Sequence, residues 1–184
     1  GAGSTPAMQI DWWAGGIGPD GKRYGHAGRN GYIVVAPGWA KEQQLQCNYA
    51  DYEHAAVIFT LRDVYRRFAV DTDRVFLSGH SMGGDAAWDI ALTNHDLWAG
   101  FVAVMPTADK PATFLWENAR YVPSYLVNGQ MDGERWVRNA VQMDRFLNLG
   151  YDTTIVRFLG RGHENFADET IRLYDWMNRR KRDP

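Results

Sequence analysis

Five apolar stretches of strand length recur along the 184-residue chain, each closed within two residues by a glycine or proline. A continuous apolar run rich in β-branched residues is typical of a strand buried on both faces of a parallel sheet, whereas a half-exposed strand alternates. The predicted strands are Tyr32–Pro37, Val75–Leu77, Gly100–Pro106, Ser124–Gly129 and Thr153–Leu159.

Segments with helical periodicity separate these strands. Asp51–Phe68 places apolar residues three or four apart with charged residues between them, as an amphipathic helix does. Further helices are predicted directly after Ser81, over Pro111–Ala119, over Glu134–Leu149 and from about Asn165 to Arg180. Regular alternation of strands and helices predicts an α/β fold: a mostly parallel twisted sheet with helices on both faces and right-handed crossovers.

The first 31 residues look different, because glycines interrupt every possible element. We predict a long loop here and no separate domain. Gly16, Gly18 and Gly21 match the pattern G-x-G-x-x-G, but Pro19 falls inside it and no strand leads into it. A dinucleotide site is therefore not predicted.

The pentapeptide Gly79–Gly83 is a candidate for the site of a nucleophilic residue. It reads G-H-S-M-G, follows an apolar run and leads into a helix-forming segment. This is the strand, tight turn and helix that a G-x-S-x-G nucleophile elbow requires, with Ser81 exposed above the sheet. The helix that follows aims its free N–H groups at the same point and favours an oxyanion there. The alternative is a glycine-rich turn without chemistry.

A serine nucleophile needs a base, and the base needs an orienting acid. Loops at the carboxyl ends of parallel strands share one rim of the sheet, so Asp132 and His163, each in such a loop, are expected near Ser81. The order Ser, Asp, His along the chain is the one expected of an α/β-hydrolase. Asp132 is alternatively a helix cap, and His163 an ordinary surface histidine.

Composition and charge exclude several classes of protein. The chain is 45% hydrophobic and 14% aromatic, which is a globular profile, and its length predicts one domain. With a formal net charge of -2, the chain has no overall positive electrostatic field that would attract nucleic acid. No stretch approaches the roughly 20 apolar residues of a membrane span. One cysteine, Cys47, excludes an internal disulfide, and neither a metal site nor a cofactor is expected.

Taken together, these motifs resemble the α/β-hydrolase superfamily, in its carboxylesterase, dienelactone-hydrolase and prolyl-oligopeptidase-like branch. The matching segments are Arg74–Gly84, Asn128–Asp132 and Gly162–His163. The resemblance implies that Ser81 is the nucleophile, His163 the base and Asp132 the acid, and that the backbone N–H of Met82 is one oxyanion donor.

A second oxyanion donor is expected near the N-terminus, because Gly1–Ser4 looks like the tail of an H-G-x-G motif. Ala2 would then supply the N–H, and the strand that feeds this loop, beside the elbow strand in this fold, would be absent from the chain. We expect residues 1–184 to form one domain, the C-terminal part of a longer polypeptide whose N-terminal segment completes the sheet. A competing interpretation takes Ala7–Trp13 as that strand and Ala14–Gly16 as the loop.

The leading functional hypothesis is a serine hydrolase that cleaves small-molecule carboxylic esters through an acyl-enzyme. The alternatives are a serine peptidase of the prolyl-oligopeptidase-like type, and a non-catalytic binding module on the same fold. Trp39, just after the first predicted strand, either lines an acyl or aryl pocket or packs a loop.

Overall fold

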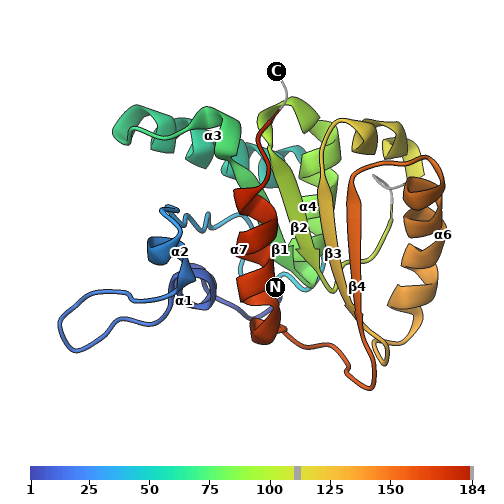
Figure 1. Ribbon diagram of the computed structural model, residues 1–184, viewed down its shortest axis with the longest axis horizontal. Coiled ribbons are helices and arrows are strands. Elements are labelled where there is room, and N and C mark those ends of the chain that lie inside the picture. Colours follow the sequence, from blue (N-terminus) through green and yellow to red (C-terminus); the bar gives the residue numbers. More distant parts are fainter. Residues whose placement is uncertain (110–112, 183–184) are drawn as a thin grey trace.

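The computed structural model describes residues 1–109 and 113–182. Its centre is a sheet of four strands, each parallel to its neighbour, in the order β1-β2-β3-β4 (Figure 1). The strands are β1 (Phe76–His80), β2 (Gly100–Val104), β3 (Ser124–Gly129) and β4 (Thr153–Phe158). Four of the five predicted strands are thus confirmed, one with identical bounds and three with bounds that differ by at most three residues.

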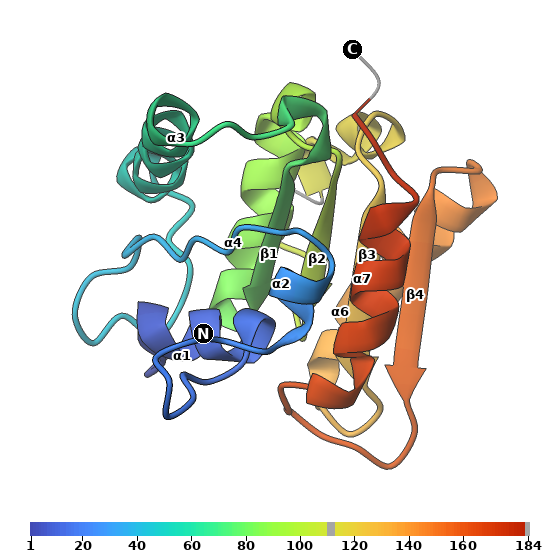
Figure 2. The same cartoon turned by 60° about the vertical axis from the view of Figure 1, so that its left-hand side comes forward.

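Helices cover both faces of this sheet. One face carries α4 (Met82–Thr93), α6 (Glu134–Asn148) and, further out, α3 (Asp51–Arg67), and the other carries α7 (Thr170–Asn178) (Figures 1 and 2). Successive strand residues point to opposite faces, so Phe101 and Ala103 pack in the α4 core while Val102 and Val104 pack in the α7 core. All four are buried, and the predicted α/β architecture is confirmed.

Short 3-10 helices also occur among the described residues. They are η1 (Thr72–Arg74), η2 (His95–Leu97), η3 (Trp116–Arg120) and η4 (Ala167–Glu169). The predicted helix over Pro111–Ala119 falls partly outside the described residues and partly on η3. The last helix begins at Thr170, later than predicted, because η4 occupies the turn before it. In the part of the chain that the structure covers, no helix is both long and apolar enough to cross a membrane.

The prediction of an entirely loop-like N-terminus is wrong. Pro6–Ala14 forms helix α1, and His26–Arg29 forms the short helix α2. The side chain of Thr5 caps α1 by accepting a hydrogen bond from the N–H of Met8, and Pro6 stands in the first turn, where its missing N–H costs nothing. A helix at these positions also excludes the competing interpretation of Ala7–Trp13 as a strand.

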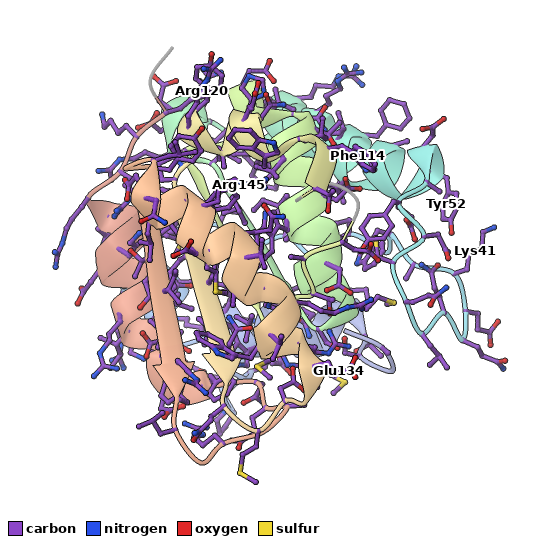
Figure 3. All side chains as sticks on the ribbon, turned by 90° about the vertical axis from the view of Figure 1, so that its right-hand side faces the viewer. Lys41, Tyr52, Phe114, Arg120, Glu134 and Arg145 are labelled. Carbon is purple, nitrogen blue, oxygen red and sulfur yellow. The ribbon has the colours of Figure 1, made fainter. Side chains whose placement is uncertain are left out.

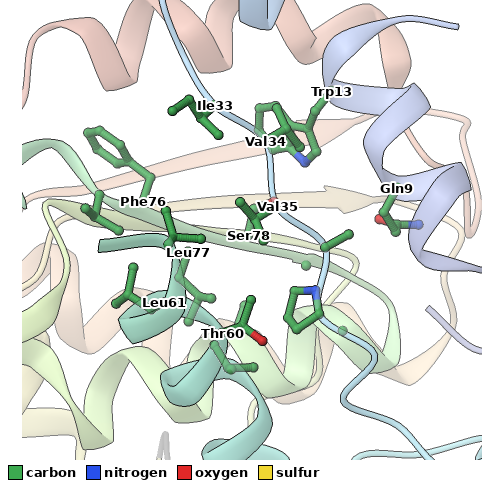
Figure 4. A pocket seen from close by; sticks show the side chains of 18 of the residues that line it. Gln9, Trp13, Ile33, Val34, Val35, Thr60, Leu61, Phe76, Leu77 and Ser78 are labelled. Atoms are coloured by element: carbon green, nitrogen blue, oxygen red, sulfur yellow. The ribbon is translucent and has the colours of Figure 1, made fainter. Parts of the chain in front are cut away.

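The predicted strand Tyr32–Pro37 is also corrected by the structure. Its residues are extended but pair with no strand of the described chain. Tyr32 and Val34 pack toward the α7 core, while Ile33 and Val35 are 53% and 44% exposed. A run of apolar residues becomes a strand only beside a hydrogen-bonding neighbour, and here a cavity of about 490 Å³ separates the segment from β1 (Figure 4).

Candidate active site

Ser81 stands at the turn between β1 and α4. Its backbone has φ 56° and ψ −123°, a conformation that a residue with a side chain rarely adopts. The turn is so tight that a Cβ on Gly79 would lie 1.7 Å from the carbonyl oxygen of Gly83. Ser81 donates its N–H to the carbonyl of Val104 at the end of β2, at 2.8 Å. These contacts fix the Ser81 hydroxyl above the carboxyl ends of the strands.

Three predicted residues form one hydrogen-bonded chain. Ser81 Oγ lies 2.8 Å from His163 Nε2, and His163 Nδ1 lies 2.8 Å from Asp132 Oδ1. Because a carboxylate only accepts, Nδ1 carries the proton that is donated to Asp132, and Nε2 is left to accept the serine proton. Asp132 follows β3 and His163 follows β4, as predicted. Asp132 does not cap α6, because the N-cap residue is Gly133 and no side chain of residues 1–109 or 113–182 caps that helix.

The loop that carries His163 is held from two sides. His80 lies 3.0 Å from the backbone oxygen of Glu164 through Nε2, which therefore donates. Burial lowers the pKa of His80, which favours its neutral form. Arg161 forms ion pairs with Glu164, at 2.7 Å, and with Asp168. The end of β1 therefore positions the base through His80 as well as the nucleophile.

Two charged residues that sequence reasoning missed lie beside this chain. Arg135, in the first turn of α6, places Nε 3.6 Å from Asp132 Oδ2 and Nη1 3.9 Å from Asp85 Oδ1. Asp85 lies one turn after Ser81 and accepts the N–H of Thr107 at 2.6 Å. Burial raises the pKa of Asp85 to about 6. The spacing of Asp85 from Ser81 was the available signal, since i and i+4 share a helix face.

The remaining histidines have other surroundings. His54, on α3, lies 2.7 Å from Asp89 on α4, and this hydrogen bond raises the pKa of His54 against the effect of its burial. His95 stacks on Tyr121 with ring centroids 5.0 Å apart. His163 is therefore the histidine that the fold presents to Ser81.

The Gly1–Ser4 segment lies beside Ser81. A Cβ on Gly1 would lie 3.3 Å from the Cβ of Ser81 and 3.0 Å from the carbonyl oxygen of His80. Ser4 folds this segment back, because its Oγ donates to the carbonyl of Gly1 at 2.7 Å. The predicted oxyanion segment, with Ala2 in it, is thus next to the predicted nucleophile.

Trp39 is half-buried against the α4 core and lines the cavity beside β1. Met82 and His80, which flank Ser81, contribute to the same cavity. Trp39 thus both packs against the core and lines the cavity, so its two interpretations, as a pocket residue and as a loop contact, stay predictions.

A parallel sheet between two helical layers, with a serine on a strained strand-to-helix turn, defines the α/β-hydrolase fold. The sequence model of the prolyl oligopeptidase family matches residues 31–145. The chain belongs to this family and has the α/β-hydrolase fold. No curated protein matches the sequence.

Solved structures share the fold. A thermostable esterase superposes with a TM-score of 0.63 at 16% identity over 70% of this chain and 36% of its own. The S-formylglutathione hydrolase FrmB of Staphylococcus aureus gives 0.60 at 17% identity over 71% and 62%, and the esterase PE8 gives 0.58 at 18% over 69% and 60%. The chain thus spans about one third to three fifths of the length of these proteins.

Proposed function

We propose that this chain carries the catalytic centre of a serine hydrolase that cleaves carboxylic esters through an acyl-enzyme. The observation that carries the proposal is the hydrogen-bonded chain from Ser81 through His163 to Asp132, with both links at 2.8 Å. Its order and atoms are those that general-base activation of a serine requires.

The proposed reaction has two half-reactions. Ser81 Oγ attacks the ester carbonyl carbon while its proton passes to His163 Nε2, and the tetrahedral intermediate collapses as the departing alcohol takes that proton. The acyl group is then bonded to Ser81. Water attacks the acyl carbon, His163 accepts the proton of the water, and release of the carboxylic acid returns the proton to Ser81. Asp132 holds the ring of His163 and stabilises the imidazolium.

The proposed oxyanion donors are the backbone N–H groups of Met82 and Ala2. Met82 is the first residue of α4, where no earlier turn supplies an intrahelical acceptor and the helix dipole favours negative charge. Ala2 follows Gly1, which packs against Ser81. Two preorganised donors aimed at one oxygen provide the electrostatic stabilisation on which acyl transfer depends.

A second candidate is a serine peptidase, which membership of the prolyl oligopeptidase family supports. The same catalytic residues serve both reactions, and the leaving group is then an amine in place of an alcohol. We rank the ester first because two of the structural neighbours are esterases. A non-catalytic binding module ranks third, since binding alone does not require the three side chains to be connected.

We also propose that residues 1–184 are one domain of a longer polypeptide, whose N-terminal segment adds a strand beside β1. The support is the edge of β1 itself. Every residue of β2 and β3 is buried, whereas each residue of β1 is at least partly exposed, and Ser78 is exposed. Leu77 and Ser78 border the cavity of about 490 Å³ (Figure 4). Gly1, which packs against Ser81, also lines this cavity.

A fluorophosphonate probe tests the proposed function. The full-length protein should be labelled on Ser81, and Ser81→Ala should abolish labelling. Ser78→Ala is the matched control, because this serine lies in β1, three residues before Ser81, and outside the hydrogen-bonded chain. Labelling of the control should equal that of the wild type. Folded protein that resists the probe, or equal labelling of Ser81→Ala, would refute the proposal. Turnover of p-nitrophenyl acetate against a peptide p-nitroanilide then separates esterase from peptidase.

A further inference from the structure

We propose that Arg135 is a positioning residue that holds the carboxylate of Asp132 in its orientation toward His163. The inference rests on the proposed function. It concerns the second oxygen of Asp132, which takes no part in the bond to His163.

Arg135 occupies an unfavourable place for a cation. It is the second residue of α6, whose N-terminus carries the positive end of the helix dipole. Figure 3 shows the neighbouring Glu134, the first residue of this helix, near the carboxyl ends of the strands. A positive charge at this position requires nearby negative charge, and Asp132 and Asp85 supply it within 4 Å.

The guanidinium is anchored independently of Asp132. Its Nη1 donates to Thr107 Oγ1 at 2.6 Å and to the carbonyl oxygen of Met105 at 3.3 Å. Both acceptors belong to the loop after β2, where Met105 has the unusual φ of 54°. Arg135 therefore joins the start of α6 to the loop after the neighbouring strand and is fixed before substrate arrives. Its planar group directs Nε toward Asp132, which a flexible ammonium does not reproduce.

The carboxylate of Asp132 needs such a neighbour. Its side chain is 10% exposed, and Oδ2 is buried without a hydrogen-bond partner among the described residues. A buried charged oxygen without a partner costs free energy unless an opposite charge lies close. Arg135 Nε, at 3.6 Å, supplies that charge. Removal of the guanidinium leaves the carboxylate free to rotate toward other donors, and His163 then loses its fixed acceptor.

The other titratable groups around this carboxylate come from three elements. His163 faces it from the loop after β4, His80 from the end of β1, and Asp85 from α4, where it shares Arg135. Loss of the Arg135 charge makes the field at the imidazole of His163 more negative, because the positive charge 3.6 Å from the carboxylate of Asp132 is then gone. A more negative field stabilises the imidazolium, so the acid limb of the rate profile should move to higher pH.

The test compares Arg135→Gln and Arg135→Lys with the control Arg138→Gln, an exposed arginine one turn further along α6. In full-length enzyme, Arg135→Gln should lower kcat on p-nitrophenyl acetate by about 10- to 100-fold, with KM changed less than about threefold. The acid limb of kcat/KM should rise by about half a pH unit or more. Arg135→Lys should recover part of both effects, and the control should match the wild type.

A spectroscopic measurement separates this inference from the proposed function. In the proton NMR spectrum, the Nδ1 proton of His163 should give a downfield resonance in the wild type that is lost or displaced in Arg135→Gln. If the wild type shows this signal but no fluorophosphonate labelling, the proposed function fails while the positioning role stands. An unchanged resonance and an unmoved acid limb in Arg135→Gln would overturn the positioning role, even if thermal stability fell.

Discussion

The closest backbone approach in the elbow gives a quantitative prediction, through the substitution Gly79→Ala. The new Cβ would lie 1.7 Å from the carbonyl oxygen of Gly83 and 2.2 Å from its carbonyl carbon. Real Cβ atoms essentially never approach closer than 3.0 Å, so β1 and the first turn of α4 must separate by about 1.3 Å, the difference between 3.0 and 1.7 Å. The obstructing atoms are backbone, and no side-chain rotation relieves the clash.

Two consequences should follow from this displacement. Overpacking at a rigid backbone contact costs about 3 kcal/mol or more of unfolding free energy. A shift of about 1 Å between Ser81 and His163 should also lower kcat by roughly 100-fold. Urea denaturation of the full-length protein, followed by circular dichroism, measures the first effect, and ester hydrolysis measures the second.

Gly28→Ala is the matched control. Gly28 lies in α2, and no atom of the described residues outside this helix and the adjoining residues lies within 4 Å of the added Cβ. Alanine is the better helix former there, so the substitution should stabilise by roughly 0.5–1 kcal/mol. The close contact between Gly79 and Gly83 would be refuted if Gly79→Ala had a free energy of unfolding within about 1 kcal/mol of that of the wild type and kept its activity.

Three further predictions follow from other contacts. His163→Ala should reduce kcat by several orders of magnitude while His54→Ala changes it little, and equal losses measured by steady-state kinetics would contradict the assignment of the base. Because the hydrogen bond to Asp89 raises the pKa of His54, its stabilisation is fully present below the unfolded pKa near 6.5 and is lost as pH rises through the folded pKa. The stability difference between wild type and His54→Gln in urea should therefore be larger at pH 5.5 than at pH 9, and a pH-independent difference would argue against it. In the full-length protein, the amides of β1 should exchange hydrogen as slowly as those of β2, whereas fast exchange would speak against a strand beside β1.

The candidate site was predictable because each of its signals is local. Gly79 and Gly83 mark a tight turn, and the fold places Asp132 and His163 at the same rim once the strands before them are recognised. Arg135 and Asp85 were missed because their role comes from proximity in space. Asp85 lies on α4, Thr107 in the loop after β2 and Arg135 on α6. Their spacing along the chain does not indicate that these three elements meet.

In the fold, too, elements with a local sequence signal were predicted, and elements that depend on distant neighbours were missed. The helix over Asp51–Arg67 has a clear amphipathic period and was predicted to within one residue. Tyr32–Pro37 carries the composition of a buried strand, but pairing depends on a neighbour that local sequence does not specify. Helix α1 was hidden by the density of glycines around it, although Thr5 and Pro6 are ordinary signals of a helix start.

The backbone of Ser81 has a consequence for how this protein evolves. Its φ of 56° suits glycine better than serine, so the position required for chemistry is one where the side chain opposes folding. Selection for stability alone would favour replacement at this position, and retention of the hydroxyl requires selection for turnover. Descendants released from that selection should lose the serine early and keep the architecture.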